Sequence, residues 1–143
     1  MKNAIENNEY IRNKKRVFDI LKKKAFDIEL LGIDKMHNED KQPMYHYKLS
    51  IDNLSFNYFE GLGHDTLDKN NKYDKIINAL HCLLLDADTM NFFKSIDDFA
   101  NEFGYTSISH TIKVFNACKE INDKLGQLFT KQELHELREN IQL

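Results

Sequence analysis

The chain has 143 residues, of which 41% are hydrophobic and 30% charged, and its formal net charge is −3. A chain of this length is the size of one domain and can bury roughly two-thirds of its unfolded surface. Five glycines and one proline exclude a collagen-like or linker protein, and the near balance of charges excludes a charge-swollen disordered chain.

The sequence shows neither a membrane-spanning segment nor a signal peptide. No apolar run approaches the roughly 18 residues of a membrane span, and residues 1–16 lack the apolar stretch of a signal peptide. Cys82 and Cys118 each lie in an apolar helical pattern, which favours two buried free thiols over a disulfide. We therefore expect a cytoplasmic protein that binds no membrane.

The N-terminal segment predicts a basic amphipathic helix between about Asn8 and Lys24. Its apolar stripe contains Ile11, Val17 and Leu21, and its other side is rich in lysine and arginine. Residues 1–24 carry a net charge of +5, which leaves −8 for the remainder. We expect a basic N-terminal arm (1–24) attached to a single α+β domain (25–143).

Three stretches then alternate polar and apolar residues in the manner of strands. They begin near Phe26, Tyr45 and Leu54, with a bend expected at Gly32 and a tight hairpin at Asp52-Asn53. The order and short connections predict a three-stranded antiparallel meander.

Helical periodicity dominates the rest of the chain. The pattern predicts a buried helix from about 73 to 85, a short helix over 96–103 capped by Ser95 and Asp98, and a helix of about 20 residues starting near Ser107. A capping box at Thr130 opens a last helix. The expected fold class is α+β, with an N-terminal amphipathic helix, the meander, and four helices packed on one face of the sheet.

Several segments between Tyr45 and Glu139 together resemble a group of small phage and prophage proteins. These segments are a strand closing on FEGLGH, a leucine-rich helix ending in Asp86 within LHCLLLDADTM, the capped segment SIDDFANEFGY, and a long helix with the pair Ala117-Cys118. The resemblance implies a mobile-element origin. Since small phage accessory proteins often block host defences or assist phage DNA metabolism, it also implies one of these two roles.

An acidic cluster follows the leucine-rich segment and is the first candidate partner-binding surface. Such a carboxylate field suits the Arg/Lys lining of a nucleic-acid-binding groove on another protein. The interpretation as an ordinary solvated surface stays open, because Asp98 also suits the cap at Ser95. The candidate residues are Asp86, Asp88, Asp97, Asp98 and Glu102.

The basic arm is the candidate nucleic-acid surface, with aromatic residues of the meander as stacking groups. Because one face of the meander must pack on the helices, the same aromatics also suit a core. The candidate contacts are Lys14, Lys15, Arg16, Lys22, Lys23 and Lys24, and the candidate stacking residues are Tyr45, Tyr47, Phe56, Tyr58 and Phe59.

The turn after the third strand is the candidate ligand site, since glycines allow a close approach and a His/carboxylate pair can move protons. Its residues are Gly61, Gly63, His64 and Asp65. The turn lacks the third glycine of a dinucleotide fingerprint, and the chain has no zinc-binding or nucleophile motif. We therefore expect no catalytic residues, no cofactor and no metal.

Three hypotheses follow, in order of preference. The first is a phage-encoded, non-catalytic binding protein that occludes a functional surface of a bacterial host-defence component, as an anti-CRISPR protein does. The second is a nucleic-acid-binding accessory protein of phage replication or recombination, and the third is a small-ligand binder or enzyme. The exposed apolar side of the arm adds the hypothesis of a homodimer.

Overall fold

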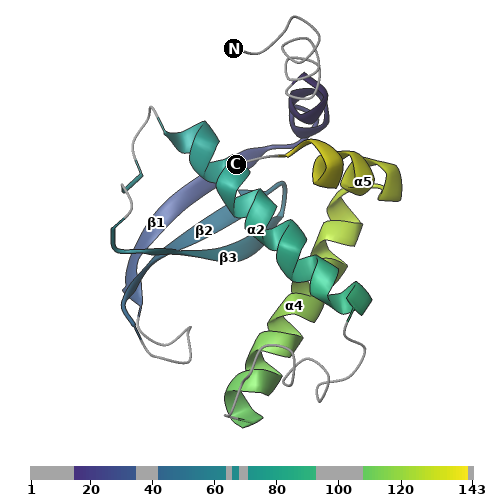
Figure 1. The fold of residues 1–143 in the computed structure, drawn as a ribbon. Coiled ribbons are helices and arrows are strands. Elements are labelled where there is room, and N and C mark those ends of the chain that lie inside the picture. Colours follow the sequence, from purple (N-terminus) through teal and green to yellow (C-terminus); the bar gives the residue numbers. More distant parts are fainter. Residues whose placement is uncertain (1–14, 35–41, 64–65, 68–70, 93–107, 142–143) are drawn as a thin grey trace, which may run out of the picture.

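The computed structural model describes residues 15–34, 42–63, 66–67, 71–92 and 108–141 (Figure 1). These residues form strands β1 (Phe26–Asp34), β2 (Met44–Ile51) and β3 (Leu54–Gly61), followed by helices α2 (Lys72–Phe92), α4 (Ile108–Leu128) and α5 (Lys131–Asn140). Residues 15–21 are also helical. The expected α+β class, with strands first and helices after, is confirmed.

The sheet is the predicted antiparallel meander, in the order β1-β2-β3. Its second hairpin turns at Asp52, whose φ of 53° is in the left-handed region that Asp and Asn tolerate better than other residues with a side chain. Gly32 has a φ of 144°, and the register of β1 against β2 shifts between Leu30 and Gly32. The bend expected at Gly32 is therefore a β-bulge, after which β1 continues to Asp34.

Alternation along the strands separates a core face from an open face. Tyr47, Leu49, Phe56 and Tyr58 are buried, and α2 crosses the sheet over this face (Figure 1). Four of the five candidate stacking aromatics accordingly point to the core face, with Tyr45 partly buried against it. Phe59 points the other way and stacks on His46, with 4.6 Å between ring centroids.

Helix α2 is longer than its sequence pattern predicted. The expectation that this helix ends near residue 85 was wrong, because it runs to Phe92 with Asp86 and Asp88 inside it. Asp disfavours a helix interior only mildly, and the fully buried Ala87 continues the apolar stripe of Leu80 and Leu83 beyond Leu85. The short helix expected over 96–103 lies outside the described residues.

The last two helices begin and end near the expected residues. Helix α4 packs against α2 and passes beside the edge strand β3, so it does not lie on the sheet face as expected (Figure 1). At the start of α5, Thr130 Oγ1 accepts a hydrogen bond from the Glu133 amide, and Glu133 Oε1 accepts one from the Thr130 amide. This is the predicted capping box.

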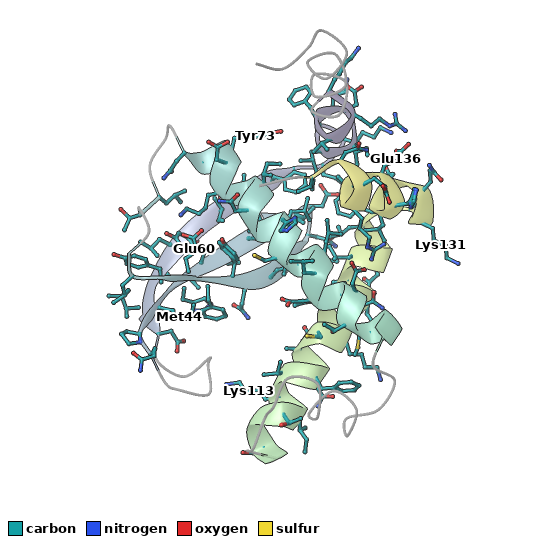
Figure 2. The ribbon with its side chains drawn as sticks, in the orientation of Figure 1. Met44, Glu60, Tyr73, Lys113, Lys131 and Glu136 are labelled. Atoms are coloured by element: carbon teal, nitrogen blue, oxygen red, sulfur yellow. The ribbon has the colours of Figure 1, made fainter. Side chains whose placement is uncertain are left out.

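Residues 15–21 belong to the same core as the sheet and helices. Val17, Ile20 and Leu21 are at most 5% exposed and pack in the common hydrophobic cluster. Arg16 forms two hydrogen bonds with the carboxylate of Glu136. Figure 2 labels Glu136, which lies on α5. The described part of the basic arm is therefore joined to the domain by both apolar packing and an ion pair.

A buried ion pair connects the sheet to the first turns of α2. The side chains of Glu60 on β3 (labelled in Figure 2) and Lys75 on α2 are each 7% exposed. The Lys75 ammonium donates to Glu60 Oε2 at 2.5 Å. The Tyr58 hydroxyl donates to the other carboxylate oxygen, and the Lys75 ammonium lies 5.0 Å from the ring centroid of Tyr47. Burial disfavours the lysine charge, but the hydrogen bond and charge of Glu60 outweigh it and raise the Lys75 pKa.

We predict that Lys75→Met lowers the free energy of unfolding by about 3 kcal/mol, because it leaves the Glu60 carboxylate buried without its counter-charge. The double variant Glu60→Gln with Lys75→Met should recover much of this loss. Urea unfolding of the two variants and the parent measures both effects. Equal stability of Lys75→Met and the parent would contradict this account of the pair.

Candidate binding groove

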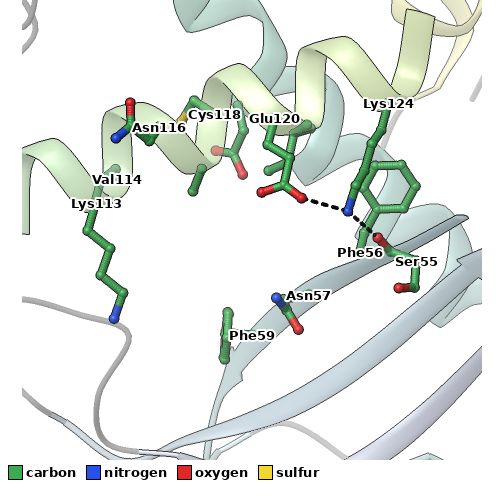
Figure 3. A pocket seen from close by; sticks show the side chains of 13 residues that line it. Ser55, Phe56, Asn57, Phe59, Lys113, Val114, Asn116, Cys118, Glu120 and Lys124 are labelled. Carbon is green, nitrogen blue, oxygen red and sulfur yellow. Dashed lines mark hydrogen bonds and ion pairs between the residues drawn. The ribbon is translucent and has the colours of Figure 1, made fainter. Parts of the chain in front are cut away.

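Described residues line a groove between the edge strand β3 and helix α4. It is an open cavity of about 540 Å³ (Figure 3). β3 contributes four side chains, α2 contributes one, and α4 contributes the remaining eight. The lining residues are Ser55, Phe56, Asn57, Phe59, Asp86, Lys113, Val114, Asn116, Ala117, Cys118, Glu120, Ile121 and Lys124.

Helical spacing explains how α4 forms its wall. Lys113, Ala117, Glu120 and Lys124 follow one another at intervals of three or four residues and so lie on one side of the helix. Ala117 is the small residue in the middle of this row. Its short side chain leaves the hollow between the longer side chains of Lys113 and Lys124.

At one end of the groove, a lysine of α4 forms a hydrogen bond to β3 and so links the two walls. Lys124 Nζ donates to the main-chain carbonyl of Ser55 at 2.9 Å and pairs with Glu120 at 2.9 Å (Figure 3). The same ammonium lies 5.5 Å from the ring centroid of Phe56. Lys113 lies toward the opposite end of the groove in Figure 3, so the two lysines stand apart.

Asp86 of α2 is the one groove residue with a strongly perturbed carboxyl group. Its side chain is half-buried, and burial raises its pKa from 3.8 to about 6. Within the described part of the chain, no hydrogen bond or ion pair reaches its carboxylate. Asp86 is therefore a desolvated carboxylate on the groove wall that pairs with no described residue.

The two cysteines near Asp86 are free, as the sequence predicted. Burial raises the pKa of both Cys82 and Cys118, and the charge of Asp86 raises it further. Both are therefore thiols at neutral pH, a state in which cysteine is a weak nucleophile.

The structure separates the acidic residues that the sequence grouped together. Asp86 faces the groove, whereas Asp88 accepts from Arg138 of α5 at 2.8 Å. Asp97, Asp98 and Glu102 lie outside the described residues. Where the chain is described, the carboxylates of the cluster thus face different neighbours.

Most described residues of the basic arm pair with acidic groups of the same chain. Besides the contact of Arg16 with Glu136, the ion pairs are Lys22 with Asp19, Lys23 with Glu133, and Lys24 with Asp52. Lys15 is exposed, and Lys14 is not among the described residues. These pairs account for much of the positive charge that suggested a nucleic-acid surface.

The candidate ligand turn is described only in part. Gly61 ends β3, while His64 and Asp65 lie outside the described residues. A side chain added at Gly63 would meet no atom within 4 Å, so no close approach requires glycine there. The described residues contain no group of three or more His, Cys, Asp or Glu side chains placed to hold a metal ion.

The sequence made Asp86 a candidate binding residue but did not predict the groove that surrounds it. Lys113, Glu120 and Lys124 are ordinary polar residues of an amphipathic helix, and this pattern gives no sign of a strand beside them. The only local signal is the small Ala117 within a row of long polar side chains.

The chain matches no protein-family model, no curated protein and no solved structure. None of the described helices has the length and apolar character needed to span a membrane.

We predict that Asp86→Asn stabilises the protein at neutral pH. The raised pKa means that the folded state holds this proton more tightly than the unfolded chain, so stability is lost as the pH rises from about 4 through about 6. Two pKa units correspond to nearly 3 kcal/mol, and partial exposure reduces the expected gain to roughly 2 kcal/mol at pH 7.5. Little gain is expected at pH 4.

Urea unfolding at both pH values measures this difference. Asp88→Asn is the matched control, because it removes a neighbouring carboxylate that is paired with Arg138 and should give no gain. A stabilisation by Asp86→Asn that is the same at pH 4 and pH 7.5 would contradict the prediction.

Proposed function

We propose that this protein is a non-catalytic binding protein whose β3–α4 groove holds part of another protein. The observation that carries the proposal is the groove itself, which combines apolar walls at Phe56 and Ile121 with a polar rim. Anchoring side chains at protein interfaces commonly insert into such pockets, surrounded by polar contacts. A single inserted side chain with its flanking residues would occupy the hollow at Ala117.

The chemistry of the described residues supports binding over catalysis. The thiols of Cys82 and Cys118 have raised pKa values, and neither has a described base hydrogen-bonded to it. Asp86 likewise has no hydrogen-bond partner among the described residues that could relay a proton. A nucleophile within reach of a base is the usual signature of covalent catalysis.

We further propose that the bound protein is a component of a bacterial host defence, and that binding inhibits it by occlusion. The resemblance of residues 45–139 to small phage proteins supports this choice. In this proposal the groove and its carboxylate Asp86 replace the broad acidic surface as the centre of contact, because Asp88 is engaged with Arg138.

The alternative of a nucleic-acid-binding accessory protein has less support from the structure. Its expected stacking residues Tyr47, Phe56 and Tyr58 are buried, and Arg16 is paired with Glu136. For a homodimer, Val17 and Leu21 are covered by the protein's own core. Among the described helical residues 15–21, this leaves Phe18, at 53% exposed, as the apolar side chain available to a second copy.

Filling the groove should abolish partner capture. We predict that Ala117→Trp reduces capture of a host-defence protein at least tenfold, because the indole occupies the hollow between Lys113 and Lys124. The measurement is a tagged pull-down from lysates that express defined defence effectors, treated with nuclease and read by mass spectrometry.

Gln127→Trp is the matched control, since Gln127 is exposed on α4 and does not line the groove. Thermal unfolding establishes that both variants are folded. Capture that Ala117→Trp leaves intact, or that nuclease removes from the parent, would overturn the proposal.

A further inference from the structure

Asp86 gives the groove a specific chemical preference. A carboxylate that is partly removed from water keeps its charge at a cost, and a cation placed against it recovers that cost. Among the described residues no cation is in contact with this carboxylate. The groove therefore presents a negative charge for which the described residues provide no counter-charge.

The other charges of the groove are either paired or exposed. Lys124 is paired with Glu120 and donates to Ser55, and Lys113 is exposed on α4. Exposed charges are screened by water and salt much more strongly than a desolvated one. Asp86 accordingly dominates the electrostatic preference of the interior, although the formal charges of the groove sum to zero.

We propose that the groove binds a guanidinium group, supplied by an arginine side chain of the protein partner, with its charge paired to Asp86. The assignment of this arginine to a protein partner rests on the proposed function. The preference for a guanidinium depends only on the groove.

The walls suit the apolar stem of an arginine. Phe56, Val114, Ala117 and Ile121 offer aliphatic and aromatic surface beside Asp86, and the amide of Asn57 lies at the rim. A guanidinium is more weakly hydrated than an ammonium and makes two parallel hydrogen bonds to a carboxylate. Arginine thus fits a half-buried carboxylate better than lysine does.

Protonation of Asp86 competes with the cation. Because the pKa of the free groove carboxyl is about 6, affinity for a guanidinium should be constant above pH 7 and fall below pH 6. Among the described residues, the titratable groups that interact with Asp86 are the thiols of Cys82 on α2 and Cys118 on α4, and the carboxylate of Glu60 on β3 acts on Cys82. Both thiols have raised pKa values and stay neutral in this range, so the decline belongs to Asp86.

The test compares butylguanidinium with butylurea, two ligands of nearly equal shape that differ in charge. Each is titrated into the full-length protein at pH 7.5 and pH 5 and followed by amide chemical shifts in NMR spectra. We expect butylguanidinium to perturb groove residues of β3 and α4 and to bind about tenfold more tightly than butylurea at pH 7.5. The preference should shrink at pH 5.

Asp86→Asn should abolish the preference, and Asp88→Asn should retain it. Equal binding of the two ligands, a preference that persists in Asp86→Asn, or shifts outside the groove only would each overturn the inference. If the preference is absent while Ala117→Trp still abolishes partner capture, the inference fails and the proposed function stands. If the preference is present and no partner is captured, the inference stands and the proposed function fails.

Discussion

The packing of α2 across the aromatic face of the sheet is the constraint on which the rest of the structure depends. The helix buries Ala79, Leu80, Leu83 and Ala87 in one continuous stripe, and the Glu60–Lys75 ion pair fixes its first turns against β3. A buried pair of this kind contributes little net stability but disfavours any other arrangement, because either charge left alone would be costly. The direction of α2 determines where Asp86 lies.

The groove is a consequence of where α4 packs. Because α2 occupies the sheet face, α4 packs on α2 and comes to lie along the free edge of β3. A free strand edge invites pairing with other chains, and lysine is a common protection against it. Lys124 donates a hydrogen bond to the main-chain carbonyl of Ser55 on this edge, and the same bond links the two walls of the groove at one end. Asp86 of α2 and the small Ala117 of α4 line the same groove.

Charge along the sequence was a poor guide to the partner. The basic segment pairs with acidic residues of α5 and of the β2–β3 turn, so its charge contributes to docking residues 15–24. The acidic cluster likewise divides between an internal ion pair at Asp88 and a desolvated carboxylate at Asp86. What distinguishes Asp86 is its solvation, which depends on neighbours that are distant in sequence.

The sequence alone determined the α+β class, the meander, the turn at Asp52, the irregularity at Gly32 and the capping box of α5. These features depend on residues within a few positions of one another, through side-chain alternation, left-handed backbone conformations and local hydrogen bonds. The tertiary structure decided the length of α2, the burial of the sheet aromatics, the pairing of Arg16 and Asp88, and the groove itself. Each of these depends on packing between elements that are far apart in the chain, for which the local pattern of residues carries no signal.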